Sequence, residues 1–277
     1  MPDQLCRTEG IVLRSVDFGE SDRIITLYSL DAGRLTVIAK GAKRSKKRFV
    51  NKLEAFSLLD VTYRPARQDN RLHFLSEAEL KDAFLFLRTD WQRYSAAMLV
   101  CELVLRFTGE HDPDRRIFFL LHWALESIHR GSSPVPVLVF FLLHLLGVCG
   151  YHPSLDGCAT CSCPPEKSRQ GHFTLQPGEG ALVCSRCRSN VSRSRFTLSL
   201  QSLKFLQTAQ KMTIKQVQRL QMPEHVAIEC LFVLSCYAKY LLQADLHSWN
   251  FFARNISQGG GRNKEGLHLP FSLSEEP

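Results

Sequence analysis

Residues 34–52 read R-L-T-V-I-A-K-G-A-K-R-S-K-K-R-F-V-N-K, and the rest of the fold is organised around this stretch. Its first residues alternate apolar and polar side chains, as a strand with one buried face does. Gly41 ends the strand, and a loop of lysines and arginines follows, with Phe49 at its tip. The stretch holds eight cations and no acid, and the whole chain of 277 residues has a formal net charge of +8. The pattern predicts a strand that delivers a flexible cationic loop.

This loop suits a polyanion whose charges are spaced along a line. Neutralising several phosphates releases their counterions, which drives binding whatever the base sequence. The net positive charge likewise favours an acidic partner, either nucleic acid or an anionic membrane surface. The alternative is a solvated charge run or a linker, and such a run alone does not decide between them.

Five short strands are predicted in the first 80 residues. Turn signals such as F-G-E-S-D and D-A-G separate them. They cover residues 10–16, 23–29, 34–40, 56–63 and 71–75. This pattern predicts a small barrel or sandwich. The OB-fold, a five-stranded barrel that binds oligonucleotides, belongs to this class, but the strand count alone does not select it.

The apolar period then changes to that of helices. Helices are predicted over residues 78–87, 92–107, 115–129, 135–149, 200–212 and 223–244. They are too apolar to stand alone, so we expect one bundle, formed by residues 81–150 and 189–255, with residues 151–188 inserted. The fold class is therefore α+β. The last residues, 256–277, are rich in glycine and polar side chains and are predicted to be a disordered tail.

The composition favours a cytoplasmic protein. The N-terminal residues lack the apolar core of a secretory signal. The uncharged stretch 131–151 is interrupted by prolines, glycines and His144, and its continuous apolar part is shorter than the roughly 20 residues that a membrane-spanning helix needs. We therefore expect no membrane span. Four cysteines lie in apolar helical stretches, where a free thiol behaves as a small hydrophobic side chain: Cys101, Cys149, Cys230 and Cys236.

Two C-x-x-C motifs predict a metal centre. They are Cys158-Ala-Thr-Cys161 and Cys184-Ser-Arg-Cys187, separated by 22 residues, close to the spacing of four-cysteine zinc sites. Two residues between ligands let one turn direct both thiolates at one ion, and four thiolates complete a closed tetrahedral shell. Residues 172–183 are predicted to form a hairpin that brings the second pair back to the first. Cys163 leaves the choice of ligands open.

A closed shell has no position for water or substrate, so we expect one structural Zn²⁺ ion. A redox role for either motif would require a thioredoxin-like strand and helix, which the pattern does not show. Phosphate-loop, G-x-S-x-G and H-E-x-x-H motifs are also absent from the sequence, and we expect no enzymatic activity. A second acid-free stretch, 180–223, gives either another cationic surface or a solvated helix face.

Two signatures resemble the RecO family of bacterial DNA repair proteins. The first is I-V-L-R-S-V-D-F-G-E-S-D-R-I-I-T-L-Y-S followed by G-R-L-T-V-I-A-K-G-A-K-R-S-K-K-R-F, and the second is G-Y-H-P-S-L-D-G-C-A-T-C at 150–161. The resemblance covers roughly residues 8 to 245. It implies an N-terminal OB-fold (residues 1–80), a helical domain and a zinc module between helices.

The resemblance also implies a recombination mediator. Such proteins bind single- and double-stranded DNA, anneal complementary strands and, with RecR, help load RecA onto DNA coated with single-stranded-DNA-binding protein. The acidic C-terminal tail of that coating protein docks on the helical domain in some members. An adaptor that acts mainly through protein partners, with only incidental DNA contact, is the alternative.

Phosphate contacts are implied at the matching basic positions of the first signature. These are Arg14, Arg23, Arg34, Lys40, Lys43, Arg44, Lys46, Lys47 and Arg48. Arg14 and Arg23 lie in predicted strands, where they can instead face the core side or pair with Asp17 or Asp22.

Overall fold

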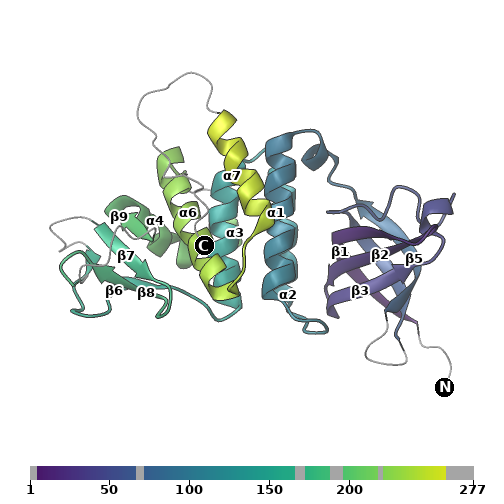
Figure 1. Ribbon diagram of the computed structural model, residues 1–277, viewed down its shortest axis with the longest axis horizontal. Coiled ribbons are helices and arrows are strands. Elements are labelled where there is room, and N and C mark those ends of the chain that lie inside the picture. Colours follow the sequence, from purple (N-terminus) through teal and green to yellow (C-terminus); the bar gives the residue numbers. More distant parts are fainter. Residues whose placement is uncertain (1–4, 67–71, 166–171, 188–195, 218–220, 260–277) are drawn as a thin grey trace, which may run out of the picture.

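The fold is described by a computed structural model over residues 5–66, 72–165, 172–187, 196–217 and 221–259. A barrel lies at one end of the molecule, a helical bundle in the middle and a small sheet at the other end (Figure 1). The bundle therefore separates the predicted cationic loop from the cysteine motifs.

The N-terminal sheet is a closed barrel in the strand order β1-β2-β3-β5-β4, and the predicted five-stranded OB-fold is confirmed. Its strands are β1 (Cys6–Phe18), β2 (Asp22–Ser29), β3 (Gly33–Ala39), β4 (Leu58–Arg64) and β5 (His73–Asp82). Alternate residues point inward, so Ile25, Leu27 and Val37 are fully buried, while the residues between them lie nearer the surface.

Two of the predicted element boundaries, those of the fourth and fifth strands, were wrong. Residues 78–87, predicted as a helix, instead complete β5 and form the short 3₁₀ helix η2 (Leu85–Arg88). Ala78 faces the barrel core opposite Val61, so pairing with β4 overrides the helical propensity of this segment. The fourth strand begins at Leu58 rather than at residue 56, because Phe56 has a left-handed φ of 75°.

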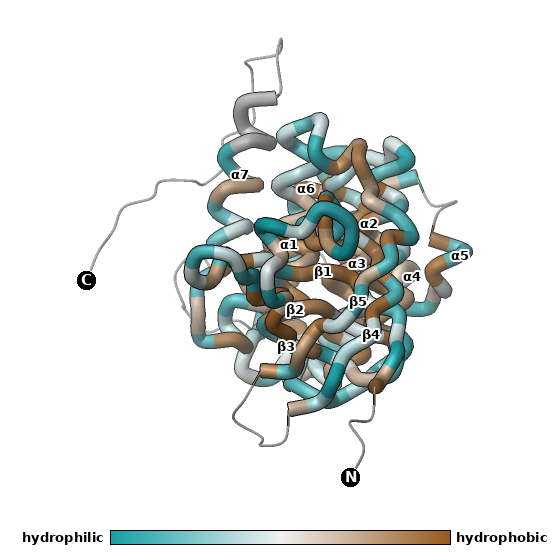
Figure 2. Tube along the Cα trace, turned by 90° about the vertical axis from the view of Figure 1, so that its right-hand side faces the viewer, coloured by the Kyte–Doolittle hydropathy of each residue, from teal (hydrophilic) through white to brown (hydrophobic). Residues whose placement is uncertain are grey.

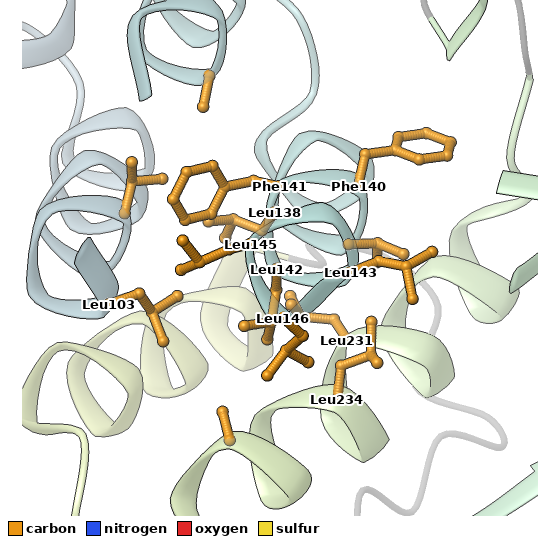
Figure 3. Close-up of a cluster of buried hydrophobic side chains, with 14 of the residues drawn as sticks. Leu103, Leu138, Phe140, Phe141, Leu142, Leu143, Leu145, Leu146, Leu231 and Leu234 are labelled. Carbon is orange, nitrogen blue, oxygen red and sulfur yellow. The ribbon is translucent and has the colours of Figure 1, made fainter. Parts of the chain in front are cut away.

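The helical bundle is built around one apolar helix. Its long helices are α1 (Trp91–Phe107), α2 (Arg115–His129), α3 (Pro134–Val148), α4 (Leu200–Gln210), α6 (Glu224–Leu242) and α7 (His247–Gly259), and α5 (Ile214–Val217) is a single turn. Leu138 and Leu142 of α3 lie among side chains of α1 and α6, including Leu103 and Leu231 (Figure 3). The residues of α3 are apolar and buried on nearly every side of the helix, as expected of a helix inside a core.

In the described part of the chain, α6 alone has the length and composition of a membrane-crossing helix. Half of its apolar window is buried within the fold, and it packs against α3 and α4. These contacts give α6 the role of a core helix of the bundle.

The C-terminal helix α7 was not predicted as a separate helix. It packs on α1 and buries Trp249 and Phe252. Residues 256–259 therefore belong to a helix rather than to the predicted tail, and residues 260–277 lie outside the described residues.

The inserted segment folds as a small sheet with the order β6-β8-β7-β9. Its strands are β6 (Ser154–Cys158), β7 (His172–Gln176), β8 (Ala181–Cys184) and β9 (Thr197–Ser199). β7 and β8 form the predicted antiparallel hairpin. Phe173 and Leu182 belong to the same buried cluster as the helical core, so the small sheet and the bundle share one core.

The barrel meets the bundle through close backbone contacts. Tyr28 Oη accepts a hydrogen bond from Asp114 N–H at 3.1 Å, and the His111 N–H donates to the Arg34 carbonyl at 3.2 Å. Gly33 lies at φ 67°, and a Cβ there would stand 2.5 Å from the backbone of Asp112. Only glycine combines this backbone angle with this close approach.

Two glycine substitutions test the importance of this junction. Gly41 has the same φ of 67°, but a Cβ there meets no atom within 4 Å. Gly41→Ala should therefore lower the free energy of unfolding by only about 1–2 kcal/mol, the cost of a left-handed angle. Gly33→Ala should cost clearly more in urea unfolding, because the Asp112 backbone must also move. Equal losses in the two variants would contradict a tightly packed junction.

Candidate nucleic-acid interface and metal centre

The cationic loop is tied at its start to the turn between β1 and β2. The Gly41 N–H donates to the Asp22 carboxylate at 2.8 Å, which, with a hydrogen bond from the Ser21 hydroxyl, holds the pKa of Asp22 below its usual value. The Lys43 N–H donates to the Ser21 carbonyl at 2.9 Å. The loop then forms the single 3₁₀ turn η1 (Ala42–Arg44). These bonds fix where the first cations of the loop emerge.

Acidic side chains in and near this turn pair with several of the predicted cations. Lys43 lies 3.1 Å from Asp17, and its hydrogen bond is the main reason that the pKa of Asp17 is lowered. Arg44 lies 3.5 Å from Glu20. Arg23, predicted as a DNA contact, also lies 3.1 Å from Asp17 and bonds Glu54 at 2.8 Å. Exposed pairs of this kind contribute about 0–1 kcal/mol each, so a phosphate can replace the acid without a large loss of stability.

Four predicted cations are more available. Arg14, Lys40, Lys46 and Lys47 are exposed, and none has an ion-pair partner within the described ranges. They are the positions from which a phosphate can be contacted with the least rearrangement.

The aromatic residue of the loop occupies a different place from the predicted one. Phe49 is buried in the barrel core rather than exposed at the tip. The Arg48 guanidinium lies 4.4 Å from the centre of its ring and donates to the Lys40 carbonyl at 2.8 Å. The loop is therefore folded against the barrel, with Phe49 as its anchor.

Arg34 lies away from the loop, at the junction with the bundle. Its Nη1 donates to the Leu105 carbonyl at the end of α1 at 2.6 Å. This bond gives Arg34 a structural role, and a DNA contact by its side chain stays a prediction.

The second basic stretch falls partly outside the described residues, which exclude Arg188, Arg193, Arg195 and Arg219. Lys204 on α4, together with Lys211 and Lys215, is exposed. Arg186 lies beside the cysteine motifs, and a hydrogen bond to Cys161 is the main cause of its raised pKa. The stretch therefore has at least one member tied to the cysteine cluster.

The four predicted cysteines come together at one end of the small sheet. Cys158 ends β6, Cys184 ends β8, and Cys161 and Cys187 lie in the turns that follow. Their sulfur atoms all lie within 4.8 Å of one another, and the Cys161 and Cys184 sulfurs are 3.8 Å apart. Zinc–sulfur bonds of about 2.3 Å in a tetrahedron place sulfurs about 3.8 Å apart. The geometry therefore fits a four-coordinate ion.

Hydrogen bonding in this cluster favours a thiolate. Burial opposes ionisation of Cys158, but N–H groups of Cys184, Cys161 and Thr160 outweigh it and lower its pKa to about 6. A hydrogen bond to Cys161 is the main cause that raises the pKa of Cys187 to about 12. Without a cation, four neighbouring thiols cannot all ionise, because the like charges repel. A divalent cation would remove that restriction.

Cys163 lies outside the four-sulfur cluster. Its sulfur is directed at the Pro164 carbonyl, 3.6 Å away, and its own carbonyl accepts the Cys158 N–H at 3.0 Å. Cys163 thus supports the turn through its backbone carbonyl, and its side chain takes no part in that hydrogen bond.

Comparison with known proteins agrees with this architecture. The family model described as Recombination protein O N terminal matches residues 1–84, and Recombination protein O C terminal matches residues 88–250. The chain belongs to the RecO family. Among the RecO proteins, the DNA repair protein RecO of Syntrophobacter fumaroxidans is 31% identical over 243 residues, covering 87% of this chain and 94% of that protein. The DNA repair protein RecO of Rubrobacter xylanophilus is 36% identical over 195 residues, covering 69% and 75%.

Membership of the RecO family confirms the resemblance seen in the sequence and identifies a DNA repair protein. The two family models meet between residues 84 and 88, where η2 begins the connection from barrel to bundle. The RecO barrel therefore carries the cationic loop, and the C-terminal part carries the cysteine cluster.

Matched cysteine substitutions test the metal centre. Cys161→Ser should abolish stoichiometric zinc binding and lower the thermal unfolding midpoint, and a chelator should do the same to the natural protein, because the ion joins two turns that are distant in sequence. Cys163→Ser, two residues beyond Cys161 but outside the cluster, should retain both the zinc content and the unfolding midpoint. Elemental analysis of the purified proteins measures the zinc content. Zinc-free natural protein, or equal zinc loss in both variants, would contradict the assignment.

Proposed function

We propose that this RecO-family chain is a non-enzymatic mediator of recombination in the bacterial cytoplasm. In this proposal it binds single- and double-stranded DNA, anneals complementary strands and helps load RecA onto DNA coated with single-stranded-DNA-binding protein. The observation that carries the proposal is the exposed cationic loop on the barrel, whose Lys40, Lys46 and Lys47 have no acidic partner in the described part of the chain.

The proposed mechanism is electrostatic. Lysines and arginines of the loop hold sugar-phosphate backbones, which carry no base information, and leave the Watson–Crick edges of the bases free to pair. As DNA binds, its phosphates can replace the acidic partners of Lys43 and Arg44, because these ion pairs are weak. Both side chains then contribute to the DNA-binding site. Screening of phosphates then lowers the repulsion between two strands that are to be annealed.

The helical part is proposed to hold the protein partners, RecR and the acidic tail of the coating protein. A cavity of about 220 Å³ at the end of α3 is lined by apolar and polar side chains together with one arginine, Arg116. The Arg116 guanidinium is paired with Asp114 at 2.6 Å, so an acidic ligand would share or replace that carboxylate. The lining residues of the cavity are Arg116, Leu143, His144, Gly147, Val148, His152 and Gln210. His144 contributes a buried Nε2 with no hydrogen-bond partner in the described residues.

The cysteine cluster is proposed to hold one structural Zn²⁺ ion through Cys158, Cys161, Cys184 and Cys187. An ion there would neutralise the four thiolates and lock the two turns together. Because the sheet and the bundle share a core, this would also stabilise the helices that face it.

A paired charge reversal tests the DNA-binding site. Lys46→Glu combined with Lys47→Glu breaks no ion pair of the described residues, so the barrel should keep its stability. Losing two phosphate contacts should weaken binding to any oligonucleotide and reduce the slope of log K against log salt by about two. Fluorescence anisotropy over a salt series measures both quantities.

The matched control reverses Arg106 of α1 and Arg254 of α7, which are exposed and, like Lys46 and Lys47, have no ion-pair partner among the described residues. It changes the net charge by the same amount and should leave the salt slope nearly unchanged. If the loop variant instead keeps the natural affinity and slope, the loop is not the DNA site. Absence of binding by the natural protein would favour the adaptor alternative.

A further inference from the structure

Two histidine rings meet where the barrel joins the bundle. His73 begins β5 of the barrel, and His111 lies in the loop between α1 and α2. Their Nε2 atoms are 3.3 Å apart, and the two ring planes are inclined at 82°. Figure 2 looks onto the barrel end of the molecule, with the strands of the barrel in front of the helices of the bundle. The histidine pair is therefore a direct side-chain contact between these two parts of the chain.

The backbone places His111 beside the barrel. Glu110 forms an isolated parallel bridge with Arg34 of β3, and the His111 N–H donates to the Arg34 carbonyl at 3.2 Å. The Thr36 hydroxyl donates to the Glu110 carboxylate at 3.2 Å. His111 itself has a left-handed φ of 58°, which histidine adopts more readily than most residues with a side chain. These contacts keep the loop on the barrel and His111 next to His73.

The hydrogen bonds fix the position of the proton on each ring. The Ala66 N–H donates to Nδ1 of His73 at 3.0 Å, so this nitrogen accepts and carries no proton. A neutral His73 therefore has its proton on Nε2 and donates it to Nε2 of His111. His111 then holds its own proton on Nδ1. In this arrangement both rings are neutral, and each hydrogen bond has one donor and one acceptor.

A further proton on either ring breaks one of these hydrogen bonds. On His73 it must go to Nδ1, where the new N–H would point at the Ala66 N–H. On His111 it must go to Nε2, where it would point at the Nε2–H of His73. Two donors that face each other repel, and two cationic rings would add the repulsion of like charges.

The same hydrogen bonds argue against a metal ion between the rings. A neutral imidazole that binds a metal through Nε2 has its proton on Nδ1 and donates it to an acceptor. Nδ1 of His73 instead faces a donor, the Ala66 N–H. The arrangement is therefore suited to sensing protons rather than to holding a cation.

We propose that His73 and His111 form a pH-sensitive latch between the barrel and the bundle, closed while both rings are neutral and weakened when either ring takes up a proton. The inference goes beyond the proposed function and does not depend on it, since neither ring is a predicted phosphate contact. Its consequence is that the attachment of the barrel to the bundle weakens as the pH falls.

The side chains that face the pair favour its neutral state. Burial, followed by the proximity of His111, lowers the pKa of His73, and the smaller effect of Glu110 raises it. Tyr63 of β4 packs edge-to-face on His73 with the ring centres 5.7 Å apart, and burial raises the pKa of its hydroxyl, so Tyr63 stays neutral. The guanidinium of Arg34 on β3 bonds a carbonyl of the bundle.

The sign of the pH dependence follows from the lowered pKa of His73. Histidine in the unfolded chain titrates near pH 6.5, so at mildly acidic pH the unfolded chain binds more protons than the closed latch. The latch therefore stabilises the junction fully above about pH 6.5. That stabilisation is lost as the pH falls through this value towards the lower pKa of folded His73.

Proton NMR of the histidine rings in the intact protein tests the latch. His73 should titrate below its ordinary pKa, and its pKa should rise towards the ordinary value in His111→Asn, which removes the facing imidazole. Asparagine also tolerates a left-handed φ, so the loop backbone should keep its conformation.

His225→Gln is the matched control. His225 is exposed on α6 and faces the uncharged Gln201 at 3.3 Å, so its loss should leave the titration of His73 unchanged. An ordinary pKa for His73 in the natural protein, or a lowered pKa that His111→Asn does not change, would overturn the proposal.

Amide hydrogen exchange measures the junction itself. The His111 N–H bonds the Arg34 carbonyl, and the Asp114 N–H bonds Tyr28 Oη. After correction for the intrinsic pH dependence of exchange, protection of both amides should fall several-fold between about pH 7.5 and about pH 6 in the natural protein. In His111→Asn, protection of the Asp114 amide should already be low at the higher pH and should change little.

Amides within the barrel sheet, such as those that pair β1 with β2, provide the internal control and should keep their protection over this pH range. Junction protection that is independent of pH in the natural protein would refute the latch, even if the variant failed to fold. An equal loss of protection across the barrel sheet would also refute it, because the acid-sensitive element would then be the whole barrel rather than its junction.

Discussion

Repulsion among like charges is the constraint that shapes the N-terminal part of this molecule. Eight cations lie within residues 34–52, and the barrel holds them without dispersing them. Acidic side chains in and near the β1–β2 turn form weak ion pairs with Lys43 and Arg44, and Phe49 anchors the loop in the core. The positive potential that remains at Lys40, Lys46 and Lys47 is the property on which the proposed DNA binding depends.

The rest of the chain gives this charged barrel a rigid support. Gly33 allows the backbone at Asp112 to approach closely, and Arg34 bonds the end of α1. Beyond that junction, one buried cluster runs through the bundle into the cysteine sheet. The cysteine cluster and the cationic loop therefore lie at opposite ends of a packed assembly (Figure 1), which suits a structural role for an ion bound by the cysteines.

Local patterns were enough to predict part of this structure. The first three strands and the helices from residue 91 to 148 follow from alternation and helical periodicity, and the clustering of the four cysteines follows from the C-x-x-C spacing. Residues whose role depends on distant contacts were misread. Ala78 is in a strand because of β4, and Phe49 is buried because the loop folds back on the barrel.

The central claim is that DNA is held chiefly through charge on the barrel. Its most direct test is the affinity of the intact natural protein for naked oligonucleotides of unrelated sequence over a salt series. The account predicts a linear fall of log K with log salt, with a slope of about −0.7 per phosphate neutralised on single strands and similar slopes for every sequence. An affinity that is insensitive to salt, or no binding even in dilute buffer, would contradict it.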